Sequence, residues 1–141
     1  MITILLVRHA DIDLPPVTAD PALNDDGRER AEALAHVAGS AGVTTVFTSS
    51  LVRTQQTVEP LLKLLGISGR LMPSAAAVAP RIRDGEFGTV VVIAGHSNTV
   101  PEVIAELGVP APPVIGESHF DNLFVVTLSD PAGAGLLTLK Y

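Results

Sequence analysis

The sequence contains no cysteine and no tryptophan, and its only other aromatic residues are one tyrosine and four phenylalanines. The absence of cysteine excludes a disulfide scaffold, a thiol nucleophile and a thiolate metal site. The scarcity of aromatic rings leaves no stacking platform that would indicate a nucleobase or a sugar. Any catalysis must therefore use side chains other than cysteine.

Positive charge is also scarce, since 9 Lys and Arg stand against 15 Asp and Glu. A chain with this net charge of -6 has no broad positive field for a nucleic acid backbone or an anionic membrane. The first apolar run stops at Arg8, far short of the roughly 20 residues that a membrane-spanning helix needs. We therefore expect a cytoplasmic protein that binds neither nucleic acid nor membranes.

The composition favours one folded domain over residues 1–141. Hydrophobic residues make up 47% of the chain, enough for a core without covalent or metal cross-links. The sequence shows no internal repeat and no linker. Nothing in it indicates an oligomeric state.

Short apolar segments alternate with segments of helical period. Strands are predicted at residues 2–7, 45–48, 70–72 and 90–94, followed by a hairpin of residues 123–128 and 136–141. Helices are predicted at about 25 to 39 or 42, 51–65 with a serine cap from Ser49-Ser50, 74–84 and 100–107. This order favours a three-layer α/β/α sandwich, with a mainly parallel sheet and an antiparallel strand near the C-terminus.

Polar side chains follow several of these strands at their carboxyl ends, where parallel sheets bind ligands. Arg8 and His9 directly follow the first strand. Arg53 lies in the first turn of the helix that follows the strand at 45–48, and His96 follows the strand at 90–94. Guanidinium groups bind phosphoryl oxygens, and a neutral imidazole can accept a phosphoryl group covalently. We expect these four side chains to converge, with His9 as the better placed nucleophile.

Four segments carry a resemblance to a known family. They are Leu6-Val-Arg-His-Ala10, Leu23-Asn-Asp-Asp-Gly-Arg-Glu-Arg-Ala31, Ser49-Ser-Leu-Val-Arg-Thr-Gln-Gln-Thr57 and Val92-Ile-Ala-Gly-His-Ser-Asn98. In order and context they resemble the motifs of the histidine phosphatase superfamily, also called the phosphoglycerate mutase-like family. The first differs from the family's Arg-His-Gly signature by alanine in place of glycine.

The resemblance implies a metal-independent phosphatase without a cofactor, in which His9 becomes a phosphohistidine that water then hydrolyses. Arg8, Arg53 and His96 would hold the transferring phosphoryl group, and Asn98 is a further candidate ligand. The substrate would be a phosphorylated small molecule or a phosphoprotein. Residues 69–89 leave little material for a lid over a phosphosugar, so a short phosphatase similar to the phosphohistidine protein phosphatases fits better than a mutase.

The family's usual proton donor is missing, because residues 70–79 contain no carboxylate. We predict Asp11 as the donor because it lies two residues after the nucleophile. Glu117 and Asp121, in the loop that leads into the antiparallel strand, are the alternative donors. With His119 they are predicted to line the substrate mouth, and for His119 and Asp121 the alternative is to cap the loop. Arg28 and Arg30 are expected to be solvated.

Two alternatives remain at this point. The run His9-Ala-Asp-Ile-Asp13 with His96 also permits a metal-dependent hydrolase, although the guanidinium of Arg8 would repel a dication. The missing acid also permits a phosphate-binding module without catalysis.

Overall fold

In the computed structural model, which describes residues 1–130 and 133–141, six strands form one mixed sheet in the order β3-β2-β4-β1-β5-β6. Strands β1 to β4 are parallel, β5 is antiparallel to β1, and β6 is antiparallel to β5. The strands are β1 (Ile2–Arg8), β2 (Thr45–Thr48), β3 (Arg70–Leu71), β4 (Val90–Gly95), β5 (Asn122–Ser129) and β6 (Gly133–Lys140). The antiparallel hairpin at the C-terminus matches the predicted one, although β6 begins three residues earlier.

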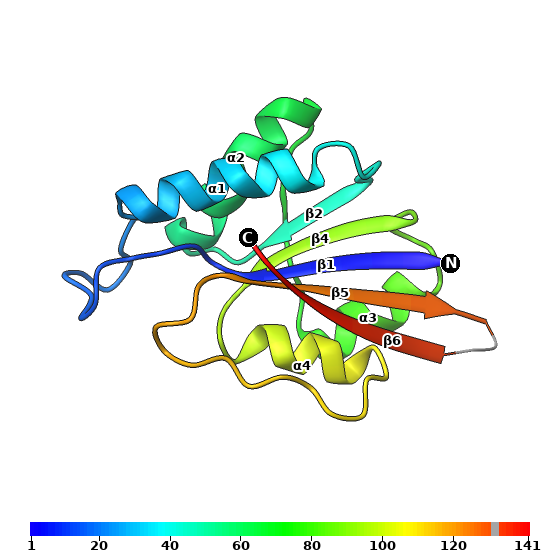
Figure 1. Cartoon of the computed structure of the whole chain (residues 1–141). Coiled ribbons are helices and arrows are strands. Elements are labelled where there is room, and N and C mark those ends of the chain that lie inside the picture. Colours follow the sequence, from blue (N-terminus) through cyan, green and yellow to red (C-terminus); the bar gives the residue numbers. More distant parts are fainter. Residues whose placement is uncertain (131–132) are drawn as a thin grey trace.

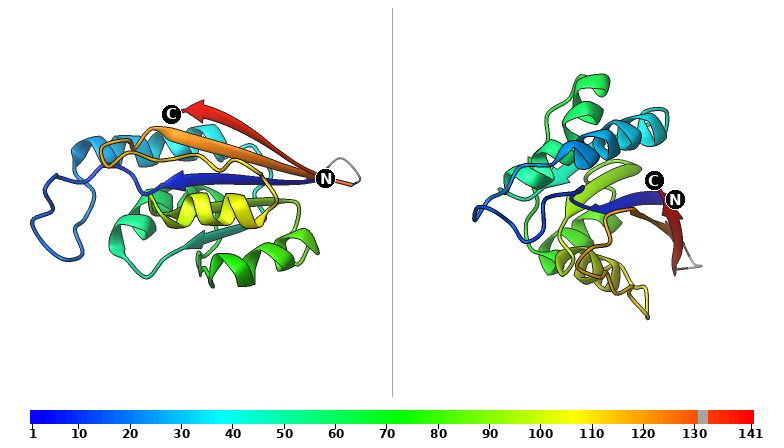
Figure 2. Two further views of the ribbon diagram at one scale, coloured as in Figure 1. Left: turned by 90° about the horizontal axis from the view of Figure 1, so that it is seen from below. Right: turned by 60° about the vertical axis from the view of Figure 1, so that its left-hand side comes forward.

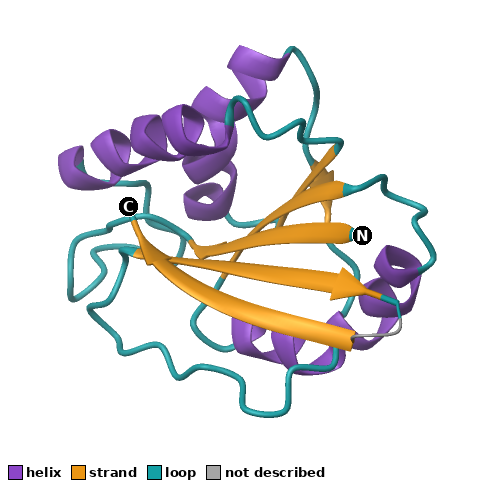
Figure 3. Cartoon of the chain, turned by 45° about the vertical axis from the view of Figure 1, so that its right-hand side comes forward, coloured by secondary structure: helices purple, strands orange, loops and turns teal. Residues whose placement is uncertain are grey.

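Helices cover both faces of this sheet (Figure 1). They are α1 (Asp25–Ala38), α2 (Val52–Leu65), α3 (Ala75–Arg83) and α4 (Thr99–Glu106). Helices α1 and α2 lie on one face and α3 and α4 on the other, as the two purple groups on either side of the sheet show in Figure 3. The predicted three-layer α/β/α architecture is confirmed.

The central strand β1 contributes to two separate cores because its successive side chains point to opposite faces. Ile4 and Leu6 pack with the buried residues of α3 and α4, whereas Leu5 and Val7 pack with those of α1 and α2. Four consecutive apolar residues are thereby buried, which explains why the strand lacks an alternating polar pattern. The buried strand ends on Arg8, so its last residue is held rigidly.

The parallel strands bring residues distant in sequence to one edge of the sheet. Arg8 of β1 is paired with Gly95 of β4, and Phe47 of β2 is paired with Ile93, so the three strands end side by side. This edge is at the left in Figure 1, and the left panel of Figure 2 shows the loop after β1 extending beyond it. The loop between α4 and β5 also reaches this edge (Figure 1).

The start of α2 differs from the prediction of a serine cap. Leu51 occupies the N-cap position and makes no side-chain cap bond. Instead, the carboxylate of Asp20, in the loop after β1, accepts the backbone N–H of Val52 at 3.0 Å. Among the described residues, no helix has the length and apolar character that a membrane crossing requires.

Candidate active site

A cavity of about 510 Å³ opens at this edge of the sheet. Arg8, His9, Arg53 and His96 all line it, as predicted from their positions after the strands. The wall opposite the sheet comes from the loop after β1 and is mostly apolar. Its residues are Ile12, Leu14, Pro16, Thr18, Ala19 and Pro21.

His9 is buried at the base of the cavity, with only 3% of its surface exposed. Its backbone N–H donates to the Gly95 carbonyl at 2.8 Å, and Nδ1 lies 2.8 Å from the Ala10 carbonyl oxygen. Because a carbonyl can only accept, Nδ1 carries the proton and Nε2 keeps its lone pair. Burial, opposed by the Ala10 bond and reinforced by the nearby arginines and His96, lowers the pKa of His9 to about 4. The imidazole is therefore neutral and nucleophilic at neutral pH.

Arg8 is fixed by the loop before β5. Its Nη1 donates to the backbone carbonyls of Gly116, Glu117 and His119 at 3.2, 2.6 and 3.2 Å. The guanidinium also lies 4.3 Å from the centroid of the Phe120 ring, in a cation–π contact. Its Nε is buried and, within the described chain, without a hydrogen-bond partner. Arg8 thus has a set position and donors left for an anion.

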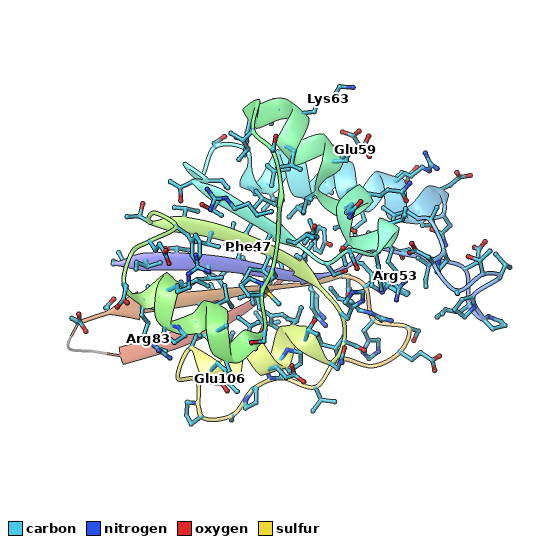
Figure 4. The ribbon with its side chains drawn as sticks, turned by 180° about the vertical axis from the view of Figure 1, so that it is seen from behind. Phe47, Arg53, Glu59, Lys63, Arg83 and Glu106 are labelled. Atoms are coloured by element: carbon cyan, nitrogen blue, oxygen red, sulfur yellow. The ribbon has the colours of Figure 1, made fainter. Side chains whose placement is uncertain are left out.

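Arg53 projects from the first turn of α2, beside the loop after β1 (Figure 4). Its Nε and Nη1 are buried and have no hydrogen-bond partner among residues 1–130 and 133–141. The nearest carboxylate is Asp20, 3.7 Å from Nη1, which is too long for a good hydrogen bond. Buried donors normally find acceptors, so these nitrogens indicate a place for an anion.

His96 faces His9 across the cavity, with 5.5 Å between the ring centroids. Its Nε2 lies 2.9 Å from Oγ of Ser49, at the end of β2. Burial, with contributions from Arg53 and Arg8, lowers the pKa of His96. Two neutral imidazoles and two guanidinium groups therefore surround one space.

The remaining predicted residues divide into two groups. Asn98 and Glu117 line the cavity. His119 is exposed and packs its ring beside Gly116, while Asp121 pairs with Lys140 at 3.5 Å. Neither His119 nor Asp121 is among the residues that line this cavity.

Asp11 departs furthest from its predicted role. Its Oδ1 accepts a hydrogen bond from Nε of Arg30 at 2.6 Å, and both side chains are largely buried. The carboxylate therefore points toward α1, and Asp11 is not among the residues that line the cavity. The structure therefore corrects two predictions, because Asp11 is not placed as the acid and Arg30 is not solvated.

The residues of the metal alternative also separate. Asp11 turns to Arg30, and Asp13 accepts a hydrogen bond from the side chain of Asn24 at 3.3 Å. Within residues 1–130 and 133–141, no group of three His, Asp or Glu side chains is arranged to hold a metal ion.

From the sequence, Ser49 is expected only to cap a helix and Thr57 has no assigned role, although both belong to one of the quoted motifs. Thr57 Oγ1 donates to the Arg53 carbonyl at 2.7 Å and accepts the Ala10 N–H at 2.8 Å. It thereby ties the residue after the nucleophile to the helix that carries Arg53. The spacing of Arg53 and Thr57, one helical turn apart, was the available signal.

Comparison with known proteins agrees with this geometry. Residues 4–90, more than half of the chain, match the family model of the histidine phosphatase superfamily (branch 1). A curated relative, the PE-PGRS family protein PE_PGRS11 of Mycobacterium tuberculosis, is 32% identical over 104 residues, or 72% of this chain. The matched region covers only 17% of the length of that relative.

Solved structures share the fold at low sequence identity. The protein histidine phosphatase SixA complexed with tungstate is 19% identical, with a TM-score of 0.79 over 99% of this chain and 97% of that one. A putative alpha-ribazole-5'-P phosphatase from Escherichia coli str. K-12 is 14% identical, with a TM-score of 0.77 over 99% and 96%. With the family match, the motifs and the shared fold in agreement, the chain belongs to the histidine phosphatase superfamily (branch 1).

Proposed function

We propose that this protein is a metal-independent phosphatase that transfers the phosphoryl group of its substrate to Nε2 of His9. The observation that carries the proposal is the contact of His9 Nδ1 with the Ala10 carbonyl oxygen at 2.8 Å. It leaves the lone pair of Nε2 available in a cavity lined by Arg8 and Arg53. A neutral nucleophile next to two fixed cations is suited to attack an anionic phosphoryl group.

The reaction takes two displacements at phosphorus. In the first, Nε2 of His9 forms a bond to phosphorus while the bond to the leaving group breaks, and the leaving group takes up a proton. In the second, water attacks the phosphohistidine, and inorganic phosphate and neutral His9 are released. Arg8, Arg53 and His96 bind the non-bridging oxygens throughout, and Asn98 at the cavity wall adds a further donor.

The substrate class we propose is a phosphomonoester or a phosphoprotein. The solved structures of similar fold include a protein histidine phosphatase and a putative alpha-ribazole-5'-P phosphatase. A phosphoprotein substrate and a phosphomonoester substrate are thus both represented among them. The outer wall of the cavity is the loop after β1, which is rich in proline and aliphatic residues. Apolar contacts with this loop, together with Glu117, would therefore select the leaving group.

Trapping of the phosphoenzyme tests the proposal. Brief incubation with an isotopically labelled phosphate ester, followed by quenching in alkali, should leave acid-labile label on the wild type and none on His9→Ala. His36→Ala is the matched control, because His36 is exposed on α1 and should label like the wild type. Label retained by His9→Ala would overturn the assignment of the nucleophile.

The same experiment separates the two alternatives. Turnover abolished by a strong chelator would favour a metal-dependent hydrolase. Phosphate binding without label or turnover, across a screen of esters and phosphoproteins, would favour a non-catalytic module.

A further inference from the structure

The turn that follows the nucleophile is attached to helix α1 by a partly buried ion pair. Nε of Arg30 donates to Oδ1 of Asp11 at 2.6 Å, and Nη2 lies 3.5 Å from Oδ2. Only 23% and 17% of the two side chains are exposed. Ion pairs on a fully solvated surface contribute little, but this one is shielded and nearly bidentate. The hydrogen bond to Asp11 raises the pKa of Arg30, so the charge is retained.

Arg30 itself has a fixed position. Its Nη1 donates to the carbonyl oxygen of Tyr141, and its guanidinium lies 5.6 Å from the centroid of the Tyr141 ring. The N–H of Tyr141 in turn donates to the Asp121 carbonyl at 3.0 Å. The side chain of Arg30 thus projects from α1 and is held in place by Tyr141. Asp11 therefore binds to a rigid partner.

The backbone of Asp11 is fastened as well. Its carbonyl accepts the N–H of Asn24 at 3.0 Å, just before α1 begins. Gly27 approaches so closely that a Cβ at this position would lie 2.2 Å from the Asp11 carbonyl oxygen. Only glycine permits this contact between helix and turn. The first turns of α1 therefore form a support for the residue two positions after His9.

This support reaches the nucleophile through a single peptide group. The carbonyl of Ala10 accepts the Nδ1 proton of His9, and the same peptide plane contains the N–H of Asp11. A rotation of Asp11 would rotate that plane and turn the Ala10 carbonyl away from the imidazole. Nδ1 would lose its acceptor, and Nε2 would lose its orientation toward the cavity.

We propose that Arg30 is a positioning residue for His9, which it orients through Asp11 and the Ala10–Asp11 peptide. The inference rests on the proposed function, and it gives the carboxylate of Asp11 the role of an anchor. Misplacement of a reacting group by ~1 Å can lower a rate by about 100-fold, so a loosened turn has a measurable cost.

Variants of two arginines on one helix provide the test. Arg30→Gln removes the ion pair, while Arg28→Gln removes an exposed charge two residues earlier in α1 and serves as the matched control. We expect Arg30→Gln to slow formation of phospho-His9 and kcat by about 10- to 100-fold with little change in KM, and Arg28→Gln to leave both unchanged. Arg30→Lys, which keeps the charge without the planar fork, should recover part of the loss.

Two further measurements distinguish positioning from simple stability. Asp11→Asn should reproduce the kinetic defect, and the double variant with Arg30→Gln should be no slower than either single variant, because both break one interaction. Nitrogen-15 spectra of labelled histidine should show the Nδ1–H tautomer of His9 in the wild type and in Arg28→Gln, and a mixture of tautomers in Arg30→Gln. This last readout requires no turnover.

The outcomes are separable. Identical histidine spectra of Arg30→Gln and Arg28→Gln overturn the positioning role, and so do identical rates of the two variants in an active enzyme. Multiplicative rate losses in the double variant overturn the link through Asp11. A wild-type protein that forms no phospho-His9 would overturn the proposed function instead, and the spectra would still decide whether Arg30 orients the imidazole.

Discussion

Oγ of Ser49 lies 2.9 Å from Nε2 of His96, and this contact joins the segments that follow β2 and β4. The same oxygen accepts the backbone N–H of Leu51 at 3.2 Å and lies 2.9 Å from Oγ1 of Thr54, so its proton has two acceptors within reach, Thr54 and the imidazole. A hydroxyl that donates to Nε2 leaves the proton of His96 on Nδ1. We infer that Ser49 donates to the imidazole, which makes Nδ1–H the group that His96 offers to a phosphoryl oxygen.

Replacement of this serine should therefore weaken catalysis without removing a charged group. A hydrogen bond contributes about 1 kcal/mol, and we expect Ser49→Ala to lower kcat by roughly 5- to 10-fold through loss of the correct tautomer. Ser50→Ala, at an exposed neighbouring position, is the control. Steady-state kinetics of both variants provides the check, and equal rates would remove Ser49 from the site.

The sequence was sufficient to predict most of the architecture, because its signals are local. Continuous apolar runs mark β1 and β4, and the predicted ends of most strands and helices lie within about two residues of the observed ones. The convergence of Arg8, His9, Arg53 and His96 followed from topology alone, since parallel strands end at one edge.

The partners of individual side chains were less predictable, because they come from segments distant in sequence. The cap of α2 is the carboxylate of Asp20, 32 residues before the N–H that it accepts. Arg30 on an otherwise polar helix face had every local feature of a solvated residue, and only the packing of the turn after β1 gives it a partner. Asp11 was near the nucleophile in sequence, but its carboxylate points to α1.

Arg53 should matter far more to turnover than Arg28. Its buried Nε and Nη1 make no hydrogen bond within the described residues, so their binding capacity is available for phosphoryl oxygens. We expect Arg53→Ala to lower kcat/KM by about 100-fold, or 2.7 kcal/mol, and Arg28→Ala to have no effect. Arg53→Lys should rescue little, because a single ammonium does not reproduce the planar fork. Inhibition by inorganic phosphate should weaken in parallel, and equal small effects for Arg53→Ala and Arg28→Ala would contradict the assignment.

Burial of a neutral His9 predicts a loss of stability in acid. Because the folded-state pKa is about 4 and the ordinary value is 6.5, the unfolded chain binds more protons between these two values. The stability contributed by the neutral imidazole is complete above about pH 6.5 and falls as the pH is lowered toward 4. The loss from His9 amounts to about 2–3 kcal/mol at the lower end.

Urea unfolding of wild type and His9→Gln near neutral pH and near about pH 4.5 measures this contribution. The variant should show a shallower fall in the free energy of unfolding, because a glutamine does not titrate. His36→Gln, at an exposed position on α1, should behave as the wild type does. The same pH dependence in all three proteins would mean that folding does not lower the pKa of His9.

The leaving group needs a proton as it departs, and a carboxyl group in the cavity can supply it. Among the described residues lining the cavity, Glu117 supplies the single carboxylate, and its backbone carbonyl is fixed by Arg8 at 2.6 Å. A general acid protonates the leaving oxygen, so its removal slows alkyl phosphates, whose alkoxides leave poorly, more than aryl phosphates. We expect Glu117→Gln to slow hydrolysis of an alkyl phosphate by about 100-fold more than that of p-nitrophenyl phosphate.

The matched control is Asp121→Asn, because the Asp121 carboxylate lies in the same loop but pairs with Lys140. This variant should slow neither ester. Asp11→Asn should slow both esters alike, since it acts through the position of His9. If Glu117→Gln also slows both alike, no side chain of the cavity acts as the acid, and the substrate must bring its own proton, as a phosphorylated imidazole does.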